Sequence, residues 1–131
     1  MWAYYFDEDA PEHPLVTTPI DKALRSERIV INTVIIMEVA HFLIKNLGPI
    51  IGKDKLDVFL SFPFVILNLD YDVTLEAIEH LRSYSHLRMG GRDATVIATM
   101  KRLGFNKIMT HDEAFKKLDW LEVIDPLQKS R

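Results

Sequence analysis

Short apolar segments alternate along this chain with longer segments that have helical periodicity. The clearest apolar segment is 64–69, in which only Asn68 is polar. A segment of this length and composition predicts a strand that is buried on both faces, as in parallel sheets. The helical segments between such strands can supply the crossovers that parallel pairing requires. The alternation therefore predicts an α/β domain with a mainly parallel sheet.

Glycine, proline and capping residues set the expected boundaries. Asn32 or Thr33 can cap a helix that runs to about Gly48, where Pro49 follows as a stop. We expect strands at 28–31, 64–69, 107–110 and 121–124, and helices at 19–26, 33–48, 53–61, 73–84, 91–103 and 113–118. With 131 residues, the chain is expected to form a single domain over 1–131.

Composition limits the classes of function. The chain is 48% hydrophobic and 27% charged, as expected of a soluble domain with a sizeable core. It has no cysteine, which leaves oxygen and nitrogen atoms as metal ligands and favours hard cations. We expect no membrane association, because no secretory signal or span of 18 apolar residues is present, and we expect a cytoplasmic location. The net charge of −3 argues against a generally basic nucleic-acid binder but permits a local basic patch.

Three acidic residues stand after predicted strands or on the helices that follow them, where parallel sheets bind ligands. Glu38 lies in an apolar helix with His41 and Lys45, and these three residues could simply form a solvent-facing stripe. Asp93 shares a helical face with Ile97 and Met100, so its carboxylate should point along the buried side.

Each acid also has an ordinary structural role open to it. Asp93 could favour the helix dipole from the first turn, and Asp112 could cap the helix that begins at Glu113. As a cluster, Glu38, Asp93 and Asp112 would repel one another unless a cation or protons lie between them. Carboxylate oxygens suit Mg²⁺ or Mn²⁺, and such a metal could activate water for phosphodiester hydrolysis.

Basic residues around Asp93 indicate a possible path for RNA. The candidates are Arg88, Arg92 and Arg102, with Arg82 and Lys101 nearby. The alternative is a solvated surface on two adjacent helices. Tyr84 is the one nearby candidate for stacking on a base.

Four segments together resemble the VapC-type PIN domain family. They are 91–98 with Asp93, 108–112 with Thr110 and Asp112, 121–126, and 31–39 with Glu38. The segment 6–14 is also similar to the loop after the first helix of that family. The resemblance implies an α/β/α sandwich and a ribonuclease that uses a divalent metal. It also implies a toxin role in which a homodimer is silenced by a small antitoxin protein.

Carried over from this resemblance, Glu38, Asp93 and Asp112 match three acids of the family's metal site, and Thr110 matches its accompanying hydroxyl residue. The family opens with a central strand that ends in Asp-x-Asn, and this sequence has no counterpart. Residues 1–6 align with the helix after that strand. We therefore expect a PIN-like sandwich that lacks its first strand, and one hypothesis is that the true start lies upstream of Met1.

Two alternatives remain at this point. A catalytically impaired PIN-like domain could bind RNA or a protein partner without cutting. A haloacid-dehalogenase-like phosphatase could use Asp70 as nucleophile and Asp72 as acid/base, because Asp70, Asp72 and Thr74 follow a strand in the required order. That fold needs a later lysine and a second acidic pair, so Asp70 is better explained as a helix cap.

Overall fold

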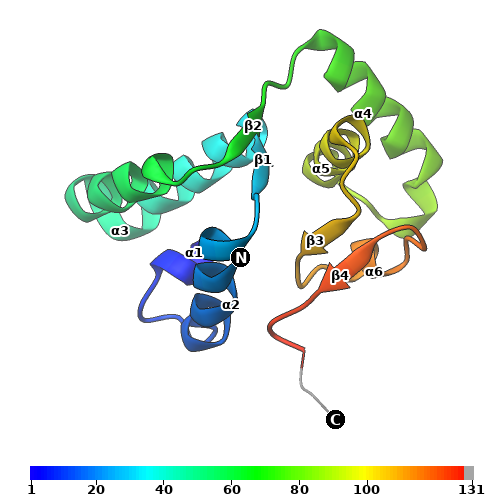
Figure 1. The fold of residues 1–131 in the computed structure, drawn as a ribbon. Coiled ribbons are helices and arrows are strands. Elements are labelled where there is room, and N and C mark those ends of the chain that lie inside the picture. The colour runs from blue at the N-terminus through cyan, green and yellow to red at the C-terminus, as the bar shows by residue number, and fades with distance from the viewer. Residues whose placement is uncertain (129–131) are drawn as a thin grey trace.

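The computed structural model describes residues 1–128, and its helices and short strands alternate as expected (Figure 1). The elements are α1 (Trp2–Phe6), α2 (His13–Ser26), β1 (Val30–Asn32), α3 (Thr33–Ser61), β2 (Val65–Leu67), α4 (Tyr71–Ser83), η1 (Ser85–Leu87), α5 (Gly91–Leu103), β3 (Lys107–Met109), α6 (Glu113–Lys116) and β4 (Glu122–Ile124). The predicted α/β class is confirmed, with a mostly helical chain and small parallel sheets.

The strands pair in parallel, as predicted, but they do not form one central sheet. β1 pairs with β2, with Val30 opposite Val65, and β3 pairs with β4, with Lys107 opposite Glu122. Among residues 1–128 these are two separate two-stranded sheets. No described strand lies between β1 and β3 to continue the hydrogen-bond ladder. A three-layer sandwich around one continuous sheet is therefore not what these residues form.

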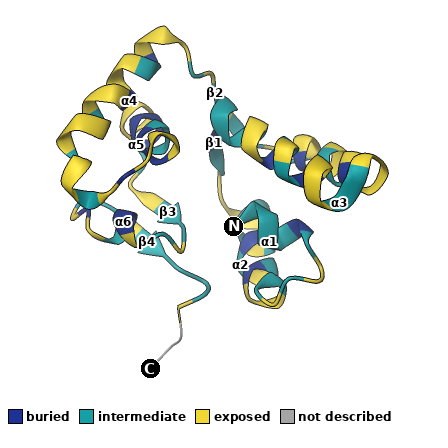
Figure 2. Ribbon diagram, turned by 180° about the vertical axis from the view of Figure 1, so that it is seen from behind, coloured by how far each residue is buried: buried dark blue, intermediate teal, exposed yellow. Residues whose placement is uncertain are grey.

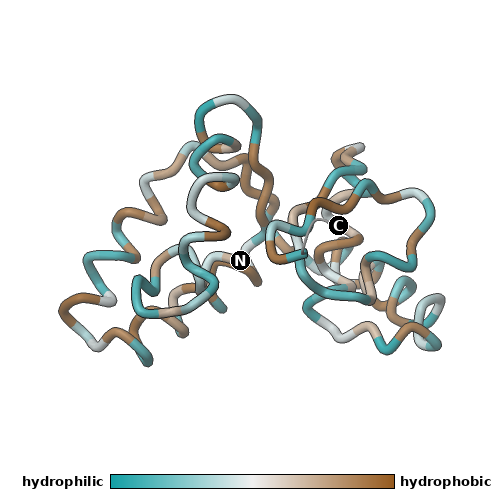
Figure 3. Tube along the Cα trace, turned by 90° about the horizontal axis from the view of Figure 1, so that it is seen from below, coloured by the Kyte–Doolittle hydropathy of each residue, from teal (hydrophilic) through white to brown (hydrophobic). Residues whose placement is uncertain are grey.

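The elements gather into two groups (Figures 1 and 3). The first runs from α1 to β2, and the second from α4 to β4. Helix α5 connects them, because it contacts β1 and α3 of the first group as well as α4 of its own. The amino terminus lies on the inner side of the first group, toward the second.

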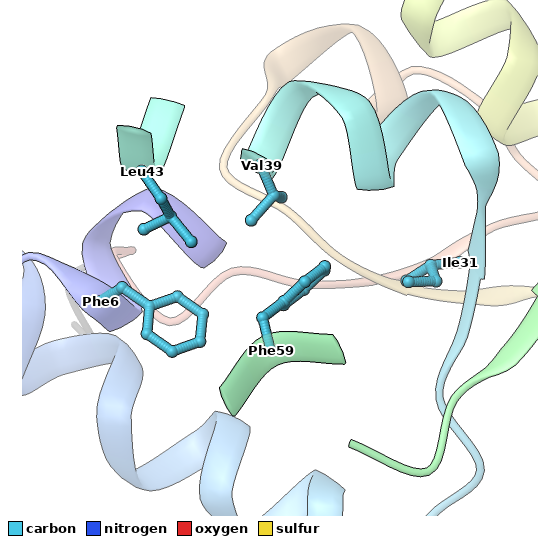
Figure 4. Close-up of a cluster of buried hydrophobic side chains, with 5 residues drawn as sticks. All are labelled: Phe6, Ile31, Val39, Leu43 and Phe59. Atoms are coloured by element: carbon cyan, nitrogen blue, oxygen red, sulfur yellow. The ribbon is translucent and has the colours of Figure 1, made fainter. Parts of the chain in front are cut away.

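An aromatic and aliphatic core holds the first group together. Phe6, Leu43 and Phe59 are buried and point toward one another from α1 and from two separate parts of α3 (Figure 4). Trp2 extends this core, because its ring lies edge-on to Phe59 with 5.2 Å between centroids. Such edge-to-face pairs contribute roughly 0.5–1.5 kcal/mol beyond area burial. This core fixes the amino-terminal helix against α3.

Small residues bring α4 and α5 together in the second group. Ala77 of α4 packs with Ala94 and Ala98 of α5, all three buried. The second group also has a core around Ile97 and Phe115, which joins α5 to α6. Figure 2 shows α5 as the most continuously buried helix of this group. Its burial makes α5 a rigid support for any functional side chain that it carries.

Helix α3 is bent into a hairpin at Gly48. This residue has φ 84° and ψ 170°, a conformation that is essentially restricted to glycine. The two arms then pack so closely that a Cβ on Gly52 would lie 2.3 Å from the carbonyl oxygen of Leu43. An 18-residue window of α3 has a mean hydropathy of 1.6, so by length and composition α3 could cross a membrane. The bend divides it into two arms, each shorter than the ~20 residues of a span.

Most boundaries agree with the predicted ones to within two residues, but α2 is an exception. It begins at His13 rather than near Pro19, because Pro14 stands in the first turn, where its missing N–H costs no hydrogen bond. Pro19 is then tolerated inside the helix. The second arm of α3 also begins earlier than predicted, directly after Gly48 instead of at Lys53.

Candidate active site

Asp93 is a buried carboxylate at the start of α5. Only 7% of the residue is exposed, and Ile97 and Met100 on the same face are also buried. The helical phase of the sequence therefore predicted its orientation correctly. The first turn of α5 lies at the junction of the two groups of elements, so Asp93 faces the first group across that junction.

Asn32 fixes α3 relative to α5. Its Oδ1 accepts a hydrogen bond from the backbone N–H of Ile35 at 2.9 Å, which caps α3 as predicted. Its Nδ2 donates to the hydroxyl oxygens of Thr99 at 3.1 Å and Thr95 at 3.3 Å, both on α5. With 1% of the residue exposed, Asn32 is a fully buried polar link. One side chain thus positions the helix of Glu38 against the helix of Asp93.

Arg92 lies between the two acids that these helices carry. Its Nη2 donates to Oδ1 of Asp93 at 3.2 Å, and its Nη1 lies 3.6 Å from Oε2 of Glu38. Glu38 is 47% exposed at the side chain, as the solvent-facing alternative predicted, together with His41 and Lys45. The guanidinium therefore joins an exposed acid on α3 to a buried one on α5.

The charges around Arg92 stabilise its protonated form. Partial burial alone would lower the pKa of Arg92, but the hydrogen bond to Asp93 and the charges of Asp93, Glu38 and Asp112 raise it above its usual value. All three predicted acids thus act on this one cation. Arg92 neutralises part of the repulsion that a cluster of carboxylates would otherwise have.

Asp112 has the capping role that was its alternative prediction. Its Oδ1 accepts from the backbone N–H of Ala114 at 2.9 Å and caps α6. Its own N–H donates to Oγ1 of Thr110 at 3.1 Å, and the N–H of Thr110 donates to the carbonyl of Ile124 at 2.9 Å. This turn holds Thr110 and Asp112 directly after β3.

A groove of about 780 Å³ lies between the two groups of elements. Glu38, Arg92, Asp93 and Thr110 are among its lining residues, and most of the others are apolar. The predicted site residues from α3, α5 and the end of β3 are therefore brought to one groove. Asp112 is not among the lining residues, and it acts on the site through its charge.

The acids do not form a closed metal site in this arrangement. Within residues 1–128 no group of three His, Asp or Glu side chains lies close enough together to hold one metal ion. Divalent cations such as Mg²⁺ require several oxygen ligands at once. Among the described residues, Glu38, Asp93 and Asp112 do not meet as one ligand group, and Arg92 pairs with Glu38 and Asp93.

Of the basic residues predicted to contact RNA, Arg92 is the one that lines the groove. Arg102 instead pairs with Glu76 of α4 at 3.1 Å, and Arg82 pairs with Glu79 at 2.9 Å. Arg88 follows η1 with a left-handed backbone at φ 59°. Lys101 lies over the rings of Tyr84 and Trp120. The predicted basic path is therefore divided between the groove and the surface of α4 and α5.

Asp70 is engaged as a helix cap. Its Oδ1 accepts from the N–H of Val73 at 2.9 Å, and its carbonyl accepts from the hydroxyl of Thr74 at 2.7 Å. Asp72 lies exposed in the first turn of α4. These contacts agree with the capping explanation and place neither residue at the groove.

Asp125 has a further buried carboxylate, which the sequence patterns did not indicate. Its Oδ2 accepts from Nζ of Lys116 at 2.7 Å and contacts Nδ1 of His111 at 2.9 Å. Burial alone would raise the pKa of Asp125, but these contacts and the N–H of Leu127 lower it to about 2. The cluster ties the end of β4 to α6 and to the loop that carries Asp112.

Sequence reasoning missed two features of the site. The first is the Asn32 link, for which the available signal was a pair of threonines one turn apart on α5. The second is the position of Arg92 between Glu38 and Asp93, since Arg92 was predicted as an RNA contact only. Its partner Glu38 is distant in sequence, and helical periodicity carries no information on such pairs.

Comparisons with known proteins agree on one family. The sequence profile of the PIN domain matches residues 1–121. Ribonuclease VapC6 of Methanocaldococcus jannaschii is 33% identical over 73 residues, which are 55% of this chain and 46% of that protein. The chain therefore aligns with about half the length of this curated relative.

Two solved structures share the fold. VapC20 of Mycobacterium tuberculosis, a sarcin-ricin loop cleaving toxin, superposes with a TM-score of 0.72 at 18% identity, covering 88% of this chain and 87% of that one. VapBC2 of Rickettsia felis, bound to a DNA fragment from its promoter, gives 0.68 at 17% identity, with coverage of 93% and 90%. The match of the PIN profile to nearly the whole chain is the decisive result: this protein belongs to the PIN domain family.

Proposed function

We propose that this chain is an endoribonuclease of toxin–antitoxin type that binds RNA at the groove between α3 and α5. The observation that carries the proposal is the meeting of Glu38, Arg92 and Asp93 at that groove. PIN domains usually use a divalent metal, and the resemblance of four segments to VapC-type proteins supports the same chemistry here. Among the described residues, the acids of this groove do not converge on one point.

The side chains at the groove suggest how RNA would be held. Arg92 is half exposed and can offer N–H donors to a phosphate, while Asp93 keeps its guanidinium oriented. Thr110 lines the same groove with its hydroxyl oxygen accepting from Asp112, so its hydroxyl proton is available to a phosphate or a water molecule. The acidic side chains restrict where a phosphate can approach.

A second candidate is a PIN-like domain that binds RNA or a protein partner without cleaving. The observation that favours it is Arg92, which pairs with two of the acids that a catalytic cation would need. The similarity to ribonuclease VapC6 and to VapBC2 supports RNA as substrate and a VapB-type antitoxin as partner for the first candidate. A homodimer is proposed for either candidate.

Cleavage of a labelled RNA in the presence of Mn²⁺ tests the proposal. We expect the chain to cleave the RNA and Asp93→Asn to abolish cleavage, because Asp93 is the buried acid of the groove. Glu113→Gln is the matched control, since Glu113 is an exposed acid that pairs with Lys116. Cleavage by the chain that persists in Asp93→Asn would assign the activity to a different site or a contaminant.

Arg92→Gln separates the two candidates further. If Arg92 holds the acids in a neutralised state, its removal should increase Mn²⁺-dependent cleavage, provided that RNA binding survives. If the natural chain and Arg92→Gln both bind RNA and neither cleaves it, the protein is the non-cleaving PIN-like domain. Arg82→Gln is the control, because Arg82 pairs with exposed Glu79 and does not line the groove.

A further inference from the structure

The loop between β3 and α6 carries two of the predicted site residues, Thr110 and Asp112. Thr110 lines the groove, and under the proposed function its hydroxyl proton is offered to a phosphate or a water molecule. Such a hydroxyl is effective only when the backbone holds it in place, since a misplacement of about 1 Å can cost about a hundredfold in rate. The contacts that hold this loop therefore matter as much as the side chains that it carries.

The backbone of this loop continues the pairing of β3 with β4 beyond the last residues of the two strands. Met109 is opposite Ile124, so the next pair in the same register is Thr110 and Asp125. The N–H of Thr110 donates to the carbonyl of Ile124 at 2.9 Å, as a further bond of the ladder would. This bond fixes one backbone atom of Thr110, so the orientation of the residue depends on the contacts that follow it.

Side chains supply the next contacts. His111 follows Thr110, and its Nδ1 lies 2.9 Å from Oδ2 of Asp125. The same oxygen accepts from Nζ of Lys116 at 2.7 Å, and Oδ1 accepts from the N–H of Leu127 at 2.9 Å. Because an ionised carboxylate only accepts hydrogen bonds, Nδ1 of His111 is the donor. The carboxylate thus holds one residue of the loop, one of α6 and one of the chain after β4.

The carboxylate of Asp125 is shielded from solvent, whereas the side chain of His111 is more than half exposed. Only 1% of the Asp125 side chain is exposed. A hydrogen bond to a buried charged group is stronger than one in water, and its loss leaves that group without a partner. Exposed ion pairs have no such constraint and hold their side chains weakly. The buried carboxylate is therefore a firm anchor for the loop.

We propose that Asp125 is a positioning residue, which holds Thr110 at the groove through the side chain of His111 and through Lys116 of α6. Asp125 is outside the described lining of the groove, so it acts on bound RNA through the loop alone. The inference rests on the proposed function where it concerns cleavage, but the fixed position of Thr110 can be measured without RNA. The alternative is that the Asp125 cluster only stabilises the fold.

NMR order parameters of the backbone N–H groups test the positioning, because they report fast motion within the folded state. Asp125→Asn leaves one acceptor oxygen where the carboxylate has two, and His111→Ala removes the contact of the loop while Asp125 keeps Lys116. In both variants we expect the order parameters of Thr110 and Asp112 to fall from about 0.85 to below about 0.6. Those of amides within α5 should not change.

A double-mutant cycle on RNA cleavage tests whether this position matters for the reaction. We expect His111→Ala to lower kcat about tenfold and to change KM less than about twofold, because the loop aligns the reacting group and contributes little to RNA binding. In the Thr110→Val background the same substitution should have no further effect, since the hydroxyl that it positions is already absent. Lys117→Met is the matched control, because Lys117 is exposed and follows Lys116 directly.

Two results would overturn the inference. Unchanged order parameters at Thr110 and Asp112 in both variants would show that the loop is held without Asp125. A full further loss of kcat from His111→Ala in the Thr110→Val background would assign the cluster a general structural role. If the natural chain binds RNA without cleaving it, the proposed function fails by itself, and a loss of order at Thr110 still supports the positioning.

Discussion

Asn32 is a single residue on which three elements depend, because it ends β1, caps α3 and bonds to α5. We expect Asn32→Ala to lower the free energy of unfolding by about 3 kcal/mol, from one cap and two buried hydrogen bonds. Asn32→Ser keeps an oxygen for the cap but cannot reach α5, so it should lose about 2 kcal/mol. Urea denaturation measures both.

Asn32→Ser is also the control for Asn32→Ala, because it keeps the oxygen for the cap and cannot reach α5. If serine restores full stability, the bonds to Thr95 and Thr99 contribute nothing. Thr99→Val should lose about 1 kcal/mol on its own, because it removes one acceptor and leaves the cap intact.

The Asp125 cluster predicts a pH dependence of stability. The folded-state pKa of about 2 lies below the ordinary value of 3.8, so the carboxylate stabilises the fold fully above about pH 4. This contribution should be lost as the pH falls from about 4 toward 2. Asp125→Asn should be less stable than the natural chain at pH 7, and the difference should disappear near pH 2. Urea midpoints across this range give the measurement, and a constant difference would contradict the assignment.

At the scale of single residues, the sequence predicted the features that depend on helical phase and on local chemistry. The buried face of Asp93 followed from its spacing to Ile97 and Met100, and the cap at Asp112 followed from its place before α6. The contact between Arg92 and Glu38 joins two helices that are distant in sequence. Only the tertiary packing determines such a distance, so it was not predictable.

Helix α3 shows how one glycine determines the form of an element. We expect Gly52→Ala to lower the free energy of unfolding by about 2–3 kcal/mol, because the added Cβ would force the arms of the hairpin apart. This loss exceeds the gain of about 1 kcal/mol in helix propensity. Thermal or urea denaturation measures the change.

Gly91→Ala is the matched control in a helix, since no atom lies within 4 Å of the Cβ position there. It should be neutral or slightly stabilising. Equal effects of the two substitutions would show that the arms of α3 separate without cost.

At the scale of elements, the stop at Gly48 was predicted because glycine followed by proline cannot continue a helix. That the second arm folds back against the first depends on a close approach at Gly52, which periodicity does not encode. The early start of α2 was not predicted, although the first helical turn accepts Pro14 without loss of a hydrogen bond.

The whole molecule exposes large apolar side chains on α3. Met37, Ile50 and Ile51 are all more than half exposed, and Ile50 reaches 77%. Exposed apolar patches of this kind favour association. We expect the chain to dimerise at micromolar concentration and the double variant Ile50→Lys, Ile51→Lys to shift it toward monomer, as measured by sedimentation velocity.

Ile78→Lys on α4 serves as the control, because Ile78 is exposed but lies on a different element. A chain that stays monomeric at the highest concentration tested, or an equal effect of both variants, would contradict this prediction.

At this largest scale the sequence predicted the class and the parallel pairing but not the division into two sheets. Strand patterns indicate which segments are extended and buried. They do not specify which strands are neighbours, because the order of strands depends on which segment occupies the middle of the sheet. β1 and β3 each have the composition of a strand within a larger sheet, yet each has one described partner.

The aromatic core of the first group has a consequence for biosynthesis. Every residue of that core, from Trp2 to Phe64, precedes α4 in the chain. A ribosome adding about 5–20 residues per second needs a further 2–7 seconds, roughly, to reach Thr99. During that interval the first core can close on its own, while the amide of Asn32 is without its threonine partners. A nascent chain whose first core closes in that interval would expose the future junction, where chaperones could bind it.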